Sequence, residues 1–241
     1  MHRCLTIAAL AAALALQAVG CAPIQDMRGQ YYLTQEQYWQ GIKSFTEVAR
    51  ENPGSAEAQY YLGRYYLALE LPEKALAHFE KAVQLDPANA DYRFWTGVAH
   101  WSMADFDAER EAYEAARELD PDHYSATLYL AHNLLDSGRH ADALTLYDRI
   151  LRDDEYDPDA LYNRAVILEE LGRADQARDA WLAYIRSYPD GSRARTAADQ
   201  LNALGDYSWR NFQVGKRRVT FKAIGFTPGT ADLTRDAKES L

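Results

Sequence analysis

A period of 34 residues runs through most of the chain and limits its possible folds more than any other feature. Pro53, Pro87 and Pro121 are spaced by this period, and one column at the same spacing is entirely aromatic: Phe45, Phe79, Tyr113, Tyr147 and Trp181. Another column holds only small residues: Gly29, Gly63, Gly97, Ala131 and Ala165. Small residues let two helices approach closely and large ones fill the space between them, so each period predicts a packed helix pair.

The turn residues place the helices within each period. Turns at Pro72, Ala104-Asp105, Ser137-Gly138 and Gly172 separate the two helices of a pair. The predicted pairs are 56–69 with 73–85, 90–103 with 107–119, 124–137 with 141–152, and 158–171 with 175–187. An amphipathic helix from Ser192 to Leu204 follows, and we expect it to cover the apolar face of the last pair. The fold class predicted is therefore all-α, an α-solenoid.

These columns resemble the tetratricopeptide repeat (TPR) family, whose repeats have the same length. The resemblance implies a TPR superhelix over residues 35–191 with a capping helix at 192–206. Residues 21–34 are either a tether or a partial first repeat. The chain departs from the family pattern at Glu109, which replaces a small residue, and at Glu155, which replaces a proline. The helix-A tryptophan of the family is also missing.

The N-terminus has the features of an export signal. Arg3 precedes an apolar run from Leu5 to Val19, which is shorter than the ~20 residues needed to cross a membrane. Ala18-Val19-Gly20-Cys21 resembles the lipobox of bacterial lipoproteins. That resemblance implies a signal peptide over residues 1–20, lipid attachment at Cys21 and, because Ala22 follows, an outer-membrane anchor facing the periplasm. The alternative is an ordinary cleaved signal.

Charge and motif content exclude several functions. The 26 Lys and Arg against 36 Asp and Glu give a net charge of −10, which argues against nucleic acid as a partner. Both cysteines precede residue 22, and no catalytic or phosphate-binding motif occurs. We therefore expect no enzyme activity, no cofactor and no metal. His100 is expected to be a packed helix residue, and the acidic run 153–159 a solvated loop rather than a calcium site.

In TPR proteins the first helices of successive pairs line a concave groove. Carrying over the family's ligand positions gives the candidate peptide-binding residues Tyr60, Arg64, Phe94, Trp101, His132 and Tyr162. This face lacks the Lys and Asn set of TPRs that clamp an acidic chain terminus. We expect a partner segment with large apolar side chains, anchored on the four rings at positions 60, 94, 101 and 162, of which at least three should be exposed.

The last residues, 207–241, differ from the solenoid. Residues 208–241 carry 7 basic and 3 acidic side chains, whereas 22–207 carry 18 and 33. Residues 217–226 alternate and predict a strand, which we expect to be loosely held because a lone strand has no partner. Phe226 to Leu241 resembles the opening strand, loop and helix of the OmpA-like peptidoglycan-binding domain. Either the chain is the front of a longer tether, or this tail is a remnant or a short module that pairs with something else.

The function expected from the sequence is a non-enzymatic, lipid-anchored periplasmic scaffold that binds envelope proteins through its groove. The alternative is a structural tether between outer membrane and peptidoglycan. The two differ in whether purified cell wall binds the protein without another protein. An enzymatic role would require turnover by the isolated chain that one substitution, such as His132→Ala, abolishes.

Overall fold

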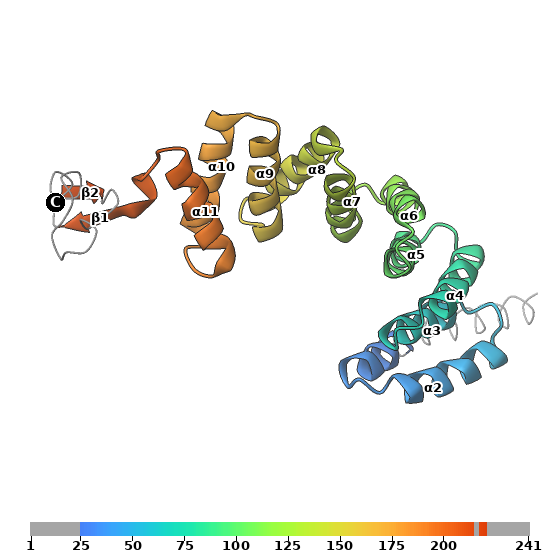
Figure 1. Cartoon of the computed structure of the whole chain (residues 1–241). Helices are drawn as coiled ribbons and strands as arrows, with labels where there is room; N and C mark the ends of the chain where they lie inside the picture. The colour runs from blue at the N-terminus through green and yellow to red at the C-terminus, as the bar shows by residue number, and fades with distance from the viewer. Residues whose placement is uncertain (1–24, 215–216, 221–241) are drawn as a thin grey trace, which may run out of the picture. The chain divides into compact units, whose positions relative to one another are not determined.

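The computed structural model describes residues 25–214 and 217–220 of the 241-residue chain. Residues 25–34 are helical. The elements that follow, shown in Figure 1, are α2 (Tyr38–Glu51), α3 (Ala56–Ala68), α4 (Pro72–Leu85), α5 (Ala90–Ser102), α6 (Phe106–Leu119), α7 (Tyr124–Asp136), α8 (His140–Asp153), α9 (Pro158–Glu170), α10 (Ala174–Ser187), α11 (Ser192–Ala203), a 3₁₀ turn (Ser208–Arg210), β1 (Asn211–Val214) and β2 (Arg217–Thr220). The expected signal peptide, Cys21 and the OmpA-like stretch lie outside the described residues.

The all-α solenoid is confirmed, and each predicted paired helix is present with ends that agree to within one residue. Short polar side chains begin several of these helices. Ser55, Asn89, Asp105 and Asp157 each accept a hydrogen bond from the backbone N–H three residues later. Such caps satisfy amide groups that have no partner inside the helix, which is why the helices begin at these points.

The helices form two compact units, which divide between Asn133 and Leu134 within α7. In the first unit the small and aromatic columns meet directly. A Cβ built on Gly63 would lie 2.5 Å from the nearest Phe79 ring atom, and one on Gly97 would lie 2.4 Å from Tyr113. Phe79 and Tyr113 are fully buried. The small and aromatic columns therefore mark the positions at which the two helices of a pair pack most closely.

The helix at residues 25–34 is packed against α3. The Tyr61 hydroxyl donates to Asp26, and the Tyr65 hydroxyl donates to the Gly29 carbonyl at 3.1 Å. Gly29 is buried because the Tyr61 ring fills the space beside it. These are the contacts of a first repeat rather than those of a free tether.

The second unit contains its own core, made of Tyr147, Ile167, Leu168, Trp181 and Leu201, all less than 2% exposed. Leu201 belongs to α11, whose small residues Ala194 and Ala197 are also buried. The helix expected to cap the last pair therefore packs on it through an apolar face. The acidic run 153–159 is a loop only at residues 154–157, since Asp153 ends α8 and Asp159 belongs to α9; in this loop Asp157 caps α9 by accepting from the Ala160 N–H at 2.7 Å.

The turn between the helices of each pair contains one residue with a left-handed backbone. These residues recur at the 34-residue period and are Glu36, Glu70, Ala104, Gly138 and Gly172, with φ between 53° and 74°. Glycine adopts this conformation without steric cost, whereas other residues pay roughly 1 kcal/mol or more. Three of the five turns therefore carry local strain.

We expect Ala104→Gly to raise the free energy of unfolding by about 0.5–1 kcal/mol, because glycine removes the strain of the left-handed backbone. Ala77→Gly, at an exposed position inside α4, should lower the same quantity by about 1 kcal/mol. Urea titration followed by circular dichroism measures both changes. If both variants change the free energy of unfolding in the same direction, backbone conformation does not determine the effect at position 104.

The expectation of an unpaired strand at 217–226 is wrong for its described part. β2 pairs antiparallel with β1, with Asn211 opposite Thr220 and Val214 opposite Arg217. Only two residues separate the strands, so the pairing is local. The polar and apolar alternation of Asn211-Phe-Gln-Val214 was the signal for this partner.

Among residues 25–214 and 217–220, no helix has both the length and the apolar character needed to cross a membrane.

Candidate binding pocket of the first unit

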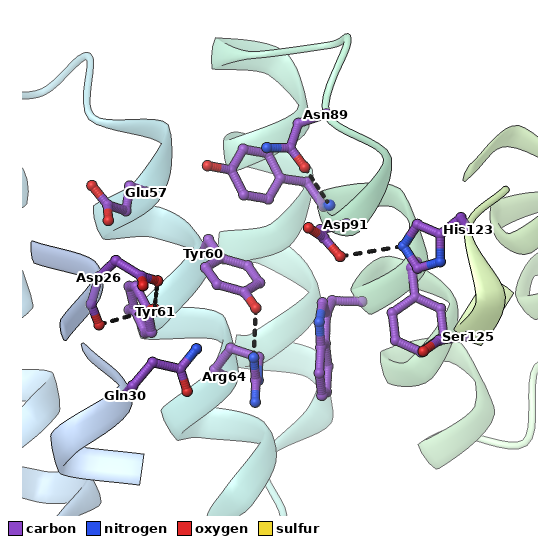
Figure 2. A pocket seen from close by; sticks show the side chains of 13 residues that line it. Asp26, Gln30, Glu57, Tyr60, Tyr61, Arg64, Asn89, Asp91, His123 and Ser125 are labelled. Carbon is purple, nitrogen blue, oxygen red and sulfur yellow. Dashed lines mark hydrogen bonds and ion pairs between the residues drawn. The ribbon is translucent and has the colours of Figure 1, made fainter. Parts of the chain in front are cut away.

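An open pocket of about 780 Å³ lies on the surface formed by the first helices of the pairs. We call it the Tyr60 pocket (Figure 2). It is bordered by the helix at 25–34, by α3 and α5, and by the start of α7 with the residue before it. Its lining consists of Asp26, Gln30, Glu57, Tyr60, Tyr61, Arg64, Asn89, Asp91, Tyr92, Phe94, Trp95, His123 and Ser125. Because its lining comes from four successive repeats, the pocket exists only when they stack.

Aromatic rings form much of the wall. The Tyr60 ring lies 5.2 Å from the Tyr92 ring, measured between centroids. Arg64 places its guanidinium carbon 3.7 Å from the centroid of the Trp95 ring and donates a hydrogen bond to the Tyr60 hydroxyl. Burial raises the pKa of Tyr92 to about 12, so its hydroxyl is neutral at physiological pH. The wall is therefore apolar on its ring faces and polar at the hydroxyl groups.

Three carboxylates line the pocket from three different helices or their first turns. Asp26 accepts a hydrogen bond from the Tyr61 hydroxyl, and Asp91 lies 3.2 Å from Nε2 of His123. Glu57 has no hydrogen-bond or ion-pair partner among the described residues. Burial, with the nearby Asp26 charge as a smaller cause, raises the pKa of Glu57 to about 7. Glu57 is thus a carboxylate without a compensating cation.

The His123 ring has a defined orientation of its nitrogens. Its Nδ1 lies 3.1 Å from the backbone nitrogen of Ala126, whose N–H can only donate. In the neutral ring the proton is therefore on Nε2, which donates it to Asp91. His123 begins α7 as a cap and at the same time holds the Asp91 carboxylate in the pocket.

The six binding residues predicted from the sequence differ in exposure and in whether they line the Tyr60 pocket. Of the six, Tyr60, Arg64 and Phe94 line the pocket. Trp101 is 58% exposed, whereas Phe94 is only 6% exposed, and Tyr60 and Tyr162 are half-buried. The expectation that at least three of these four rings are exposed is therefore wrong.

Phe94 is buried because rings surround it: Tyr113 at 5.5 Å and Tyr129 at 5.4 Å between centroids. Phe94 still lines the Tyr60 pocket, although little of its ring is exposed. His132 is half-buried, packs beside Tyr129 and is not part of the pocket lining. His100 is also half-buried and packed in α5, with its Nδ1 at 3.6 Å from Asp105.

Trp101 borders a smaller pocket of about 490 Å³ with Leu67, Glu70, Pro72 and Ser102. We call it the Trp101 pocket. Its exposed indole beside Leu67 of α3 and Pro72 of α4 offers an apolar contact surface.

Tyr162 belongs to the second unit and its ring is not free. Trp181 and Tyr184 pack against it at 5.3 Å each. The guanidinium carbon of Arg193, from α11, lies 5.1 Å from its centroid. The capping helix thus covers a position that a peptide occupies in the sequence-based prediction.

Sequence reasoning did not identify Glu57, Asp91 or Trp95 as pocket residues. A usable signal was present: Glu57, Asp91 and Asp159 lie in one column of the 34-residue period, one turn before Tyr60, Phe94 and Tyr162. Within residues 25–214 and 217–220, no group of three or more His, Cys, Asp or Glu side chains is placed to hold a metal ion.

Comparison with known proteins decides the family. The family model described as tetratricopeptide repeat matches residues 27–90, 63–124, 96–158 and 128–192. The chain belongs to the tetratricopeptide repeat family. These TPR matches overlap and cover the helix at 25–34 from residue 27 through to the start of α11. No relative is found among curated protein sequences.

Solved TPR structures share this fold. The protein PilF of Pseudomonas aeruginosa has a TM-score of 0.66 at 18% identity, over 75% of this chain and 83% of that one. YrrB, described as a TPR protein with an unusual peptide-binding site, has a TM-score of 0.62 at 20% identity, over 71% and 88%. MamA has a TM-score of 0.58 at 20% identity, over 73% and 96%. At these identities the similarity establishes the TPR scaffold fold alone.

Proposed function

We propose that this TPR protein is a lipid-anchored scaffold of the bacterial cell envelope that binds a peptide segment of a partner protein. The observation that carries the proposal is the open Tyr60 pocket, together with the exposed Trp101, on the first helices of the repeats. TPR solenoids present such surfaces for recognition. The description of YrrB as a peptide-binding TPR protein supports a peptide as the kind of partner.

The anchor in this proposal is a lipid on Cys21, with the protein on the outer membrane facing the periplasm. Asp26 of the pocket lining is five positions after Cys21 in the sequence. An extended chain spans at most about 3.6 Å per residue, so the pocket would open within roughly 20 Å of the lipid surface. Partner segments close to the membrane are therefore the expected ligands. The mass of the intact protein extracted in detergent tests the lipid directly.

The test of the scaffold function uses site-specific crosslinking in living cells. A photoreactive phenylalanine at position 101 should form discrete crosslinked products, because this side chain borders a recognition surface. Position 106 is the matched control, since Phe106 is 57% exposed on α6, the second helix of the same pair. Equal products from both positions would contradict binding on the first helices.

A second candidate is a tether between the outer membrane and peptidoglycan. It rests on the resemblance of Phe226 to Leu241 to the start of an OmpA-like domain. Purified cell wall should then sediment the purified protein without any other protein present, and deletion of residues 221–241 should abolish this. If sedimentation is absent, the tether candidate is rejected and the scaffold function is unaffected.

A further inference from the structure

A carboxylate followed three residues later by a tyrosine recurs at equivalent positions in the two units. Glu57 and Tyr60 lie at the start of α3, and Asp159 and Tyr162 lie three periods later at the start of α9. In each case the carboxylate is in the first helical turn and the ring is one turn further on. The solenoid therefore contains two versions of one local arrangement.

In the second unit this arrangement holds an arginine. Nη1 of Arg193 lies 2.7 Å from Oδ1 of Asp159, and its guanidinium carbon lies 5.1 Å from the centroid of the Tyr162 ring. A carboxylate at the edge and an aromatic face below are the two groups that a guanidinium prefers. The chain thus shows directly which side chain this arrangement binds.

In the first unit the corresponding arginine is missing. Arg193 lies one period after Asp159, and the residue one period after Glu57 is Asp91, an acid. Arg64 takes only part of its place: its guanidinium carbon lies 5.5 Å from the Tyr60 centroid and 3.7 Å from the Trp95 centroid, and it bonds the Tyr60 hydroxyl rather than Glu57. Figure 2 shows Glu57 and Arg64 on opposite sides of the Tyr60 ring. The Glu57 side of the pocket has no cation among the described residues.

We propose that the Tyr60 pocket binds an arginine side chain of the partner, with its guanidinium between Glu57 and Asp91 and against the Tyr60 ring. The inference rests on the proposed scaffold function and names the chemistry of its ligand. Residues 25–133 carry 18 Asp and Glu against 9 Lys and Arg, so the surrounding charge also favours a basic segment. Apolar contacts at Trp101 are compatible with this anchor.

Binding should depend on pH. The charged and titratable groups that face Glu57 from the surrounding elements are Asp26, Tyr60, Tyr61, Arg64, Asp91, Tyr92 and His123. With the pKa of Glu57 raised to about 7, this carboxyl is largely protonated at pH 6 and ionised at pH 8. A guanidinium favours the ionised form, so affinity should fall several-fold from pH 8 to pH 6.

The test selects ligands from a random peptide display library with the purified full chain. The selected peptides should share an arginine, and its replacement by norleucine should abolish binding. Glu57→Gln, a nearly isosteric change, should weaken binding of the tightest selected peptide at least about tenfold and remove most of the pH dependence of that binding. Glu80→Gln, on the exposed surface of α4 and outside the pocket, is the matched control and should change neither.

A second variant copies the arrangement of the other unit. Asp91→Arg places an arginine one period after Glu57, as Arg193 lies after Asp159, and should block arginine peptides. Its circular dichroism spectrum shows whether the helices remain folded. Selected peptides that require Trp101 but contain no arginine would overturn the arginine proposal and leave the scaffold function standing. Arginine peptides whose binding is unaffected by Glu57→Gln would also overturn the arginine proposal. If no selected peptide depends on Glu57 or on Trp101, both the arginine proposal and the scaffold function are overturned.

Discussion

Trp181→Ala should lower the free energy of unfolding by about 3–5 kcal/mol, the largest effect that we expect from any single substitution in this chain. Trp181 is 1% exposed in the core of the second unit. Its ring packs on Tyr162, and its Nε1 donates to Glu169 at 3.2 Å. Alanine leaves a cavity at this position, and α10 cannot move to fill it because it is packed against both α9 and α11. Urea titration followed by circular dichroism measures the loss.

Two further substitutions make this prediction specific. Trp181→Phe keeps a ring in the aromatic column, where Phe45 and Phe79 already occur, and should recover more than half of the lost free energy. Trp101→Ala removes an identical side chain that is 58% exposed and should change stability by less than about 0.5 kcal/mol. A large loss for Trp101→Ala would show that this indole serves packing rather than recognition.

Gly63→Ala should lower the free energy of unfolding by about 2 kcal/mol, although alanine favours a helix interior by about 1 kcal/mol over glycine. The sign is reversed because the new Cβ would lie 2.5, 2.6 and 2.9 Å from three atoms of the Phe79 ring. Phe79 is fully buried and cannot move aside without displacing α4. Thermal unfolding measured by calorimetry gives the change.

The matched control for Gly63→Ala is Gly54→Ala. A Cβ at Gly54 would meet only Oδ1 of Asn52, at 3.6 Å, so this change should be close to neutral. In the double variant Gly63→Ala with Phe79→Leu, the smaller side chain makes room for the methyl group, and part of the loss should be recovered. If the losses of unfolding free energy for Gly63→Ala and Phe79→Leu are additive in the double variant, the close approach of the two helices is not the cause of the Gly63→Ala effect.

Most of the helical architecture could be predicted from the sequence because its determinants are local or periodic. Caps such as Ser55 and Asn89 begin helices through hydrogen bonds to residues three positions away. The Gly63 and Phe79 columns report packing between neighbours in the chain. In a solenoid each repeat contacts mainly the next one, so a one-dimensional pattern contains most of the fold.

The candidate site could be predicted only in part. Tyr60, Arg64 and Trp101 follow from their positions on the first helices. Phe94 occupies the position equivalent to Tyr60 yet is buried, because Tyr113 and Tyr129 come from other helices. Exposure depends on which side chains from neighbouring repeats cover a position, and a repeat alignment does not contain that information.

The sequence by itself determined the family, the helix pairs and the positions at which their small and aromatic residues meet. Tertiary structure decided which equivalent positions remain open. Asp159 and Tyr162 are covered by Arg193 because α11 packs beside them, whereas Glu57 and Tyr60 border an open pocket that faces Asp91. The physical reason is that local helix formation depends on nearby residues, while the charge and accessibility of a pocket depend on the sum of side chains from several repeats.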